Sequence, residues 1–167
     1  MTNTPHTILN HTEINHKIMR IAYQIYESNA NESEIILAGI AERGYEFALL
    51  LAETLEKISP LKITKCKVFI DKNTPQNEVK TSITSDDYEN KSVVLIDDVL
   101  NSGATLVYGV KHFLNVPLKQ FKTAVLVNRN HKKYPVKADF KGISLSTSLS
   151  EHVKVEFTPN NYKAYLL

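Results

Sequence analysis

Two adjacent carboxylates, Asp97 and Asp98, are followed by a loop of small, amide-bearing and hydroxyl-bearing residues, 101–105. The branched apolar residues just before them, 93–96, predict a strand that is buried on both faces, as in a parallel sheet. The apolar pattern of 106–114 predicts a helix directly after the loop. A strand, a turn and a helix N-terminus bring backbone N–H groups together, which suits a phosphate. Because the two carboxylates can accept hydrogen bonds from sugar hydroxyls or hold a hydrated divalent cation, the segment fits a ribose 5-phosphate.

This segment resembles the 5-phosphoribosyl 1-diphosphate (PRPP) motif of type I phosphoribosyltransferases, in which an apolar strand is followed by two acids and a hydroxyl- and glycine-containing loop. The resemblance implies a catalytic role for the two acids, which would hold Mg²⁺ directly or through water. It also implies that PRPP is bound by Asp97, Asp98, Asn101, Ser102, Gly103, Ala104 and Thr105. The simpler interpretation is a buried strand that ends in a solvated acidic turn. That interpretation leaves the spacing of the glycine and the two hydroxyls unexplained.

The composition is that of one globular enzyme domain. The chain has 167 residues, of which 43% are hydrophobic and 23% charged, so we expect a single domain over 1–167. The net charge is only +2, so nucleic-acid binding would need a local basic face. Cys66 is the only cysteine, which excludes an internal disulfide and a cysteine-rich zinc site. With no signal-like leader and no apolar run of about 20 residues, we expect a cytoplasmic protein without membrane contact.

Helices and strands are predicted to alternate along the chain. Residues 1–9 are expected to be loosely ordered, and the order of the other elements favours an α/β fold with a mostly parallel sheet flanked by helices. Ligands bind beyond the carboxyl ends of parallel strands, so the loops 39–44, 97–105 and 128–133 should meet at one site. Apolar spacing predicts helices over 10–28 and 45–58, and strands over 35–40, 63–70, 122–128, 143–147 and 153–157.

Two further segments match the same family. The two glycines of 39–44 allow backbone close to a ligand, and the guanidinium of Arg43 suits a pyrophosphate. The resemblance makes this the pyrophosphate loop, with Glu42, Arg43 and Gly44 binding PRPP and Arg43 taking part in catalysis.

Residues 71–91, here called the flap segment, form a polar stretch that is long for a loop in a compact domain. The family has a mobile flap here, and the charged residues of the segment include Lys72, Lys80, Asp86 and Asp87. Either lysine would meet the pyrophosphate, and a plain solvated loop is the alternative.

A third polar loop, 128–135, is basic and follows a predicted buried strand. From about residue 12 to residue 157 the chain is similar to the bifunctional pyrimidine-operon attenuation protein/uracil phosphoribosyltransferase family. The similarity implies a small hood over the site, uracil as the acceptor base, and a base pocket that includes Arg129 and His131. A basic surface turn without a ligand is the alternative for this loop.

Three departures from the family pattern limit how much of the family's function can be expected of this chain. Asn101 stands where many purine transferases have an aspartate, and a neutral amide cannot act as that base, which argues against a 6-oxopurine acceptor. Ala104 stands where the attenuation family usually has an arginine. The flap segment is preceded by Phe69-Ile70 and begins Asp71-Lys72, whereas the family has Tyr-Arg-Asp-Asp, which weakens the case for efficient turnover.

We therefore expect transfer of a ribose 5-phosphate group from PRPP to a nitrogenous base, with uracil the first candidate and Mg²⁺ the cofactor. The alternatives are a nucleotide-sensing, RNA-binding regulator of pyrimidine genes and a PRPP- or nucleotide-binding protein with little turnover. Fewer phosphate contacts would make RNA binding weaker, because Asn15 and His16 replace two arginines typical of the family. The basic residues retained for RNA are Lys17, Arg20, His131, Lys132, Lys133, Lys137 and Lys141. We also expect a homo-oligomer, although the sequence fixes neither the number of subunits nor the acceptor base.

Overall fold

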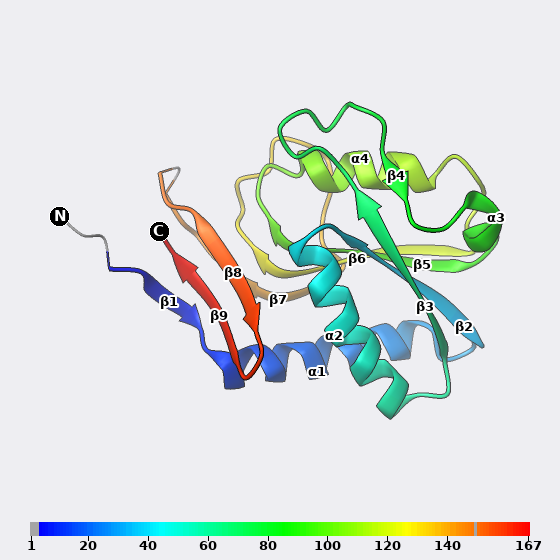
Figure 1. Cartoon of the computed structure of the whole chain (residues 1–167), viewed down its shortest axis with the longest axis horizontal. Coiled ribbons are helices and arrows are strands. Elements are labelled where there is room, and N and C mark those ends of the chain that lie inside the picture. The colour runs from blue at the N-terminus through cyan, green and yellow to red at the C-terminus, as the bar shows by residue number, and fades with distance from the viewer. Residues whose placement is uncertain (1–3, 149) are drawn as a thin grey trace.

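A six-stranded sheet forms the centre of the computed structural model, which describes residues 4–148 and 150–167. The strand order is β4-β3-β2-β5-β6-β7, and all neighbours are parallel except the short edge strand β4. Helices α1 and α2 cover one face of the sheet and α4 covers the other (Figure 1). The predicted α/β fold, with a mostly parallel sheet flanked by helices, is confirmed. The strands are β2 (Glu34–Ile40), β3 (Lys62–Phe69), β4 (Lys80–Thr81), β5 (Ser92–Leu100), β6 (Gln120–Asn128) and β7 (Phe140–Ser144), and the helices are α1 (His11–Ser28), α2 (Arg43–Ile58) and α4 (Ala104–Phe113).

The two faces of the sheet carry separate apolar cores because successive side chains of a strand point to opposite faces. In β5, Val94 and Ile96 pack with α1 and α2, whereas Val93 and Leu95 pack beneath α4. This central strand is therefore apolar on both sides up to residue 96. Because both faces of β5 are buried as far as Ile96, the position of this strand also determines where the polar residues from Asp97 onward lie.

Helix α1 begins as its sequence predicts. The side chain of Asn10 accepts a hydrogen bond from the N–H of Glu13 at 2.9 Å, which caps the helix N-terminus. Ile14, Ile18 and Ile25 form part of its buried stripe against the sheet. Its other face carries polar residues together with exposed Met19 and Tyr23. No helix in residues 4–148 and 150–167 has the length and apolar character needed to cross a membrane.

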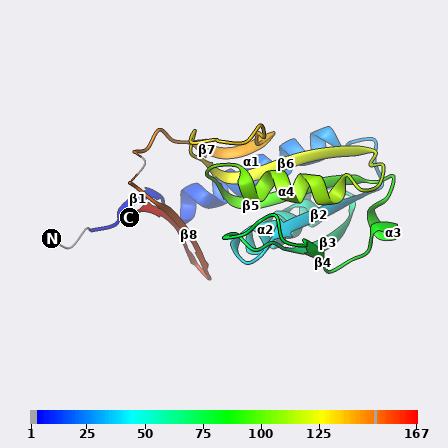
Figure 2. The same ribbon diagram turned by 90° about the horizontal axis from the view of Figure 1, so that it is seen from above.

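A second, antiparallel sheet of three strands stands beside the central one (Figures 1 and 2). This small sheet consists of β1 (His6–Leu9), β9 (Asn161–Leu166) and β8 (Val153–Thr158). The prediction that residues 1–9 are loosely ordered is wrong for 6–9, because His6 pairs with Leu166 at the other end of the chain. For residues 1–3 the prediction lies outside the described residues. Leu9, Val155 and Ala164 are buried and join the core formed with α1 and α2.

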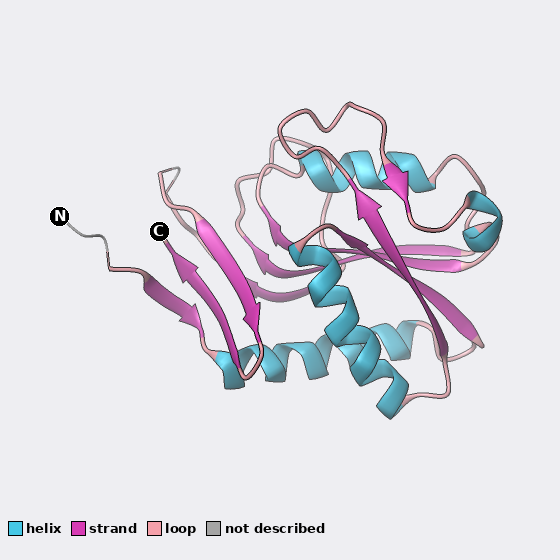
Figure 3. Cartoon of the chain, in the orientation of Figure 1, coloured by secondary structure: helices cyan, strands magenta, loops and turns pink. Residues whose placement is uncertain are grey.

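The flap segment is more ordered than a plain loop. It contains β4 and the short helix α3 (Ser85–Tyr88), and Tyr88 is buried against Phe113 of α4. The longest stretch of the segment without helix or strand lies between β3 and β4, and Figure 3 shows it as a loop above α4. The last parallel strand is also displaced, to 140–144 from the expected 143–147. After Leu145 donates its N–H to Asn128 O at 2.8 Å, the chain leaves the sheet.

Candidate functional site

The acid pair lies inside β5, so the prediction that the strand ends at residue 96 and a loop begins at Asp97 is wrong. Strand β5 pairs with β6 as far as Leu100, so Asp97 and Asp98 still belong to the sheet. Its other neighbour, β2, stops pairing at Gly39, opposite Ile96. The carboxylates therefore border the open end of β2, where Asp97 is 3% exposed and Asp98 is half-buried.

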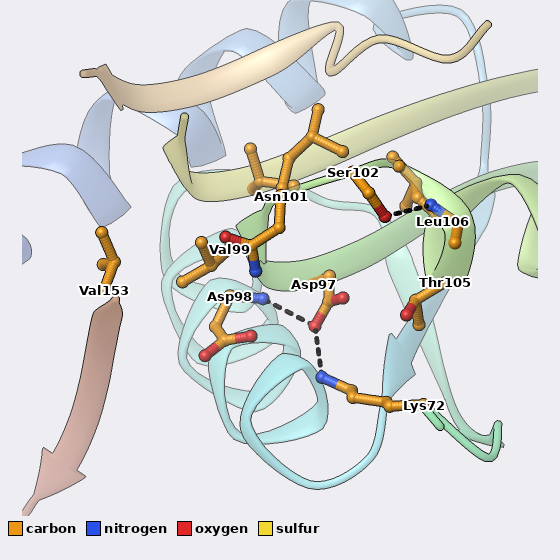
Figure 4. Close-up of a pocket in the computed structure, with 13 residues that line it drawn as sticks. Lys72, Asp97, Asp98, Val99, Asn101, Ser102, Thr105, Leu106 and Val153 are labelled. Atoms are coloured by element: carbon orange, nitrogen blue, oxygen red, sulfur yellow. Dashed lines mark hydrogen bonds and ion pairs between the residues drawn. The ribbon is translucent and has the colours of Figure 1, made fainter. Parts of the chain in front are cut away.

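Asp97 is a strongly perturbed acid. Burial, followed by the neighbouring charge of Asp98, raises its pKa well above the ordinary value of 3.8. Two donors oppose this effect: Lys72 Nζ lies 3.5 Å from Oδ1, and the N–H of Asp98 donates to the same oxygen at 2.9 Å (Figure 4). The ionised form of Asp97 therefore depends on a cation in the site, and the flap segment supplies one.

The phosphate loop, 101–105, wraps the N-terminus of α4 as predicted. Gly103 is the N-cap residue with φ +88°, a left-handed conformation that favours glycine. A Cβ at this position would lie 2.6 Å from Val136 Cγ1, so a larger residue would also collide. The N–H of Ala104 donates to Ser102 Oγ at 3.2 Å. The turn therefore presents backbone at a helix N-terminus, which is the geometry that binds phosphate.

The third loop supports the phosphate loop from behind. The N–H groups of Lys133 and Tyr134 donate to Ser102 O at 2.7 and 3.2 Å, and the N–H of Arg129 donates to Leu100 O at 3.0 Å. These backbone bonds fix the course of the chain directly after β5. The loop thus has a clear structural role.

The two residues predicted to bind the base point their polar atoms elsewhere. Arg129 is 5% exposed, and its guanidinium donates to Asn101 Oδ1, Thr147 Oγ1 and the carbonyl oxygens of Ser148 and Glu151. His131 Nε2 lies 2.7 Å from Thr147 O. Both side chains hold the segment that leads into β8. A direct base contact would require breaking some of these bonds.

The predicted pyrophosphate loop packs its backbone against the acid pair. A Cβ on Gly44 would lie 2.9 Å from Asp97 Cα, so this glycine permits the close approach. The peptide bond between Ala41 and Glu42 is cis. The side chains of the loop turn outward: Arg43 Nη1 pairs with Glu46 at 3.2 Å, and Glu42 pairs with a lysine of β3 at 3.3 Å.

A cavity of about 380 Å³ joins the acid pair to the phosphate loop (Figure 4). Lys72 lines it, whereas Lys80 borders a separate pocket beside Glu42. Asp87 is also elsewhere, accepting the N–H of Thr84 at 2.8 Å at the start of α3. The structure thus selects Lys72 from the charged residues of the flap segment.

The opposite end of the cavity has apolar walls. They come from Val99 of β5 and Val153, the first residue of β8 (Figure 4). Sequence reasoning missed Val153, because only tertiary packing brings the small sheet to this edge. No local pattern in the sequence distinguishes it from any other strand valine.

The acid pair fits a magnesium ion that arrives with its ligand. Within the described ranges, no three His, Cys, Asp or Glu side chains gather closely enough to hold a metal. Asp97 and Asp98 supply two carboxylates, and Mg²⁺ usually completes its shell with water and phosphate oxygens. Magnesium bound to PRPP would meet that requirement.

Comparisons with known proteins agree with this geometry. The model of the phosphoribosyl transferase domain matches residues 6–159. The bifunctional protein PyrR of Clostridium kluyveri is 32% identical over 170 residues, covering 95% of this chain and 96% of that protein. The bifunctional protein PyrR of Streptomyces coelicolor is 34% identical over 157 residues, covering 89% and 81%.

Solved structures with the same fold include two purine enzymes. A hypoxanthine-guanine phosphoribosyltransferase from Bacillus anthracis has a TM-score of 0.77 at 17% identity, covering 96% of both chains. The hypoxanthine phosphoribosyltransferase of Trypanosoma cruzi has a TM-score of 0.76 at 15% identity, covering 97% of this chain and 95% of that one. At such low identity the likeness shows the fold alone.

Proposed function

The chain belongs to the phosphoribosyl transferase family, and we propose that it transfers the ribose 5-phosphate group of PRPP to uracil and releases pyrophosphate. One observation carries the proposal: the acid pair of β5 and the phosphate loop of α4 line the same cavity. Carboxylates for a sugar diol and amides for a phosphate, joined by one cavity, match a ribose 5-phosphate. The relatives named as bifunctional PyrR proteins support a pyrimidine rather than a purine role.

In this proposal the 5-phosphate of PRPP lies on Ser102–Thr105 of the phosphate loop. The helix dipole of α4 and the loop N–H groups would stabilise its charge. Asp97 and Asp98 would accept hydrogen bonds from the ribose hydroxyls. The raised pKa of Asp97 is consistent with this role, because a buried carboxylate gains most from charge-assisted hydrogen bonds.

The pyrophosphate would lie between the pyrophosphate loop and Lys72. Arg43 would leave Glu46 to reach it, at little cost because both side chains are more than 40% exposed and such pairs contribute only about 0–1 kcal/mol. Bound Mg²⁺, held by the acid pair directly or through water, would supply charge neutralisation at the phosphate oxygens. As N1 of uracil bonds to the anomeric carbon, the bond from that carbon to the pyrophosphate oxygen breaks. The electron pair leaves on pyrophosphate, which takes up the N1 proton.

The base would occupy the apolar end of the cavity, between Val99 and Val153. The small sheet, which carries Val153, would serve as the predicted hood. We propose that Arg129 and His131 act on the base indirectly, by holding this end of the cavity in place. Their hydrogen bonds to Thr147 are the support for that role.

Pyrophosphate release measured with PRPP, Mg²⁺ and a panel of uracil, hypoxanthine and guanine tests the proposal. We expect turnover with uracil above that with either purine. The double variant Asp97→Asn/Asp98→Asn should stay folded and lose PRPP affinity, whereas the control Asp87→Asn, which is remote from the cavity, should keep it. Preference for a purine by the wild type would refute the choice of uracil. Tight PRPP binding without turnover of any base would instead indicate a nucleotide-binding protein.

A second candidate function is RNA binding controlled by nucleotide. Its support is a basic face on α1, β7 and the third loop, where Lys132, Lys133 and Lys141 are exposed. Arg20 is only partly available, because its guanidinium donates to the carbonyl oxygens of Lys141 and Gly142 at 3.0 and 2.8 Å. An RNA titration at several salt concentrations, with and without uridine monophosphate, tests this function. Affinity that ignores both salt and nucleotide would count against it.

A further inference from the structure

Arg129 connects the phosphate loop to the segment that enters the small sheet. Nη1 donates to Asn101 Oδ1 at 2.9 Å, while Nε and Nη2 donate to Thr147 Oγ1 at 3.0 and 2.9 Å. Nη2 also donates to the carbonyl oxygens of Ser148 and Glu151 at 3.2 and 2.6 Å. With a side chain that is almost fully buried, this guanidinium has little freedom to move.

The contact with Arg129 determines which end of the Asn101 amide faces the cavity. A guanidinium has only donors, so the amide must present its oxygen to it. The two N–H groups on Nδ2 are therefore turned away from Arg129. Asn101 lines the cavity and is exposed, so these donors are available to a ligand.

Asn101 lies at the part of the cavity that suits a base. Ser102 and Thr105 lie at one end of the cavity and Val153 at the other, and Asn101 and Val99 lie between them (Figure 4). The base is the only large apolar part of a ribonucleotide, so it belongs between the two valines. Asn101 then faces the edge of the base, where its carbonyl or N–H groups are.

We infer that Asn101 is a specificity-determining residue, whose amide N–H groups donate to a carbonyl oxygen of the acceptor base, and that Arg129 is the positioning residue that holds it in this orientation. The inference rests on the proposed function. Uracil presents a carbonyl oxygen on either side of N3, one of them adjacent to N1, and a donor beside that oxygen would stabilise charge that develops as N1 reacts. A purine with its proton on N7 presents a donor instead, and an amide N–H cannot accept it.

Sulfur substitution on the ligand tests the hydrogen bond directly, because a thiocarbonyl is a weaker acceptor than a carbonyl. Binding of uridine monophosphate and its 2-thio and 4-thio analogues is measured for the wild type and for Asn101→Ala, together with turnover of the three bases. We expect the wild type to prefer one oxygen over its sulfur analogue by roughly tenfold. In Asn101→Ala the ratio should approach one. The ratio compares ligands within one protein, so general weakening cancels.

Three further variants separate this hydrogen bond from a general effect on the fold. Asn101→Asp keeps the contact with Arg129 but presents an oxygen to the base in place of the N–H groups. This variant should therefore bind uridine monophosphate more weakly. Arg129→Lys, or Thr147→Val if that protein does not fold, should lower the oxygen-to-sulfur ratio by freeing the amide. Asn31→Ala, in the exposed turn after α1, should change nothing.

Equal oxygen-to-sulfur ratios in the wild type and Asn101→Ala would overturn the inference even if uracil is turned over. Absence of turnover in the wild type would refute the proposed function, while the binding ratios would still decide the role of Asn101. If uridine monophosphate does not bind the wild type at all, both the inference on Asn101 and the proposed function are overturned.

Discussion

Replacing Asp97 by asparagine should make the protein more stable and PRPP binding weaker. Burial and the charge of Asp98 raise the pKa of Asp97, so the ionised side chain destabilises the folded state at neutral pH. Asparagine keeps an acceptor for the Asp98 N–H, which now donates at 2.9 Å, and removes the charge. The ion pair with Lys72 is lost, but Lys72 is 46% exposed, so that loss costs only about 0–1 kcal/mol.

The net gain should be about 0.5–2 kcal/mol in the free energy of unfolding at neutral pH, as is usual when a functional but destabilising group is removed. For a chain of this length, each kcal/mol raises the melting temperature by roughly 2–4 °C. Loss of charge-assisted hydrogen bonds to the ribose should cost about 1.5–3 kcal/mol of PRPP binding, or roughly 10–150-fold in Kd.

The dependence on pH separates this explanation from a general packing effect. A carboxyl with a raised folded-state pKa contributes stability below its unfolded pKa, and that contribution is lost as pH rises through the folded pKa. Urea unfolding from pH 5 to pH 8 should therefore show a downward slope in the wild type that Asp97→Asn lacks. The control Asp87→Asn should instead lower the free energy of unfolding over this pH range, because hydrogen bonds from Thr84 lower the pKa of Asp87. The stabilising contribution of Asp87 is lost only at lower pH. An Asp97→Asn protein that is less stable than wild type at pH 8, or that keeps the slope, would refute the reasoning.

Three other outcomes are expected. Amides of 71–79 should exchange rapidly in the free protein and become protected with PRPP and Mg²⁺, and equal exchange in both states would argue against a closing flap. Gly103→Ala should destabilise the protein by roughly 1–3 kcal/mol through its left-handed φ and the collision with Val136, so an unchanged urea midpoint would contradict the geometry. Lys72→Met should weaken PRPP binding up to about fivefold, and more at pH 6 than at pH 8, because the pKa of Asp97 rises further without the cation; calorimetry at both pH values measures this, and equal losses would contradict it.

Local patterns in the sequence predict the parts of the fold that depend on local contacts. The apolar run 93–96 predicts the central strand because both of its faces are buried, and the Asn10 cap predicts where α1 begins. The glycine and hydroxyl residues around Gly103 predict a turn at a helix start, because an apolar helical pattern follows them directly. These features are encoded within a few residues of one another.

Features that depend on distant residues could not be predicted. Strand β1 forms only because β9 lies beside it, and nothing in residues 6–9 indicates that partner. The position of Asp97 inside β5 follows from the unequal lengths of two neighbouring strands. The engagement of Arg129 depends on Asn101 and Thr147, which are 28 and 18 residues away in sequence. A basic residue in a loop predicts a ligand contact as readily as a structural one, and only the folded arrangement distinguishes them.

Arg129 also makes the two ends of the cavity thermodynamically dependent on each other. Its guanidinium bonds Asn101 with one nitrogen and Thr147, Ser148 and Glu151 with the others. A nucleotide that shifts Asn101 therefore alters the free energy of the segment entering the small sheet. Linkage requires the reverse effect to be equal. If the nucleotide changes the affinity of a macromolecule for that segment by some factor, the macromolecule changes the affinity of the nucleotide for the cavity by the same factor. Through one buried side chain, the free energy of the segment entering the small sheet would thus depend on whether the cavity is filled.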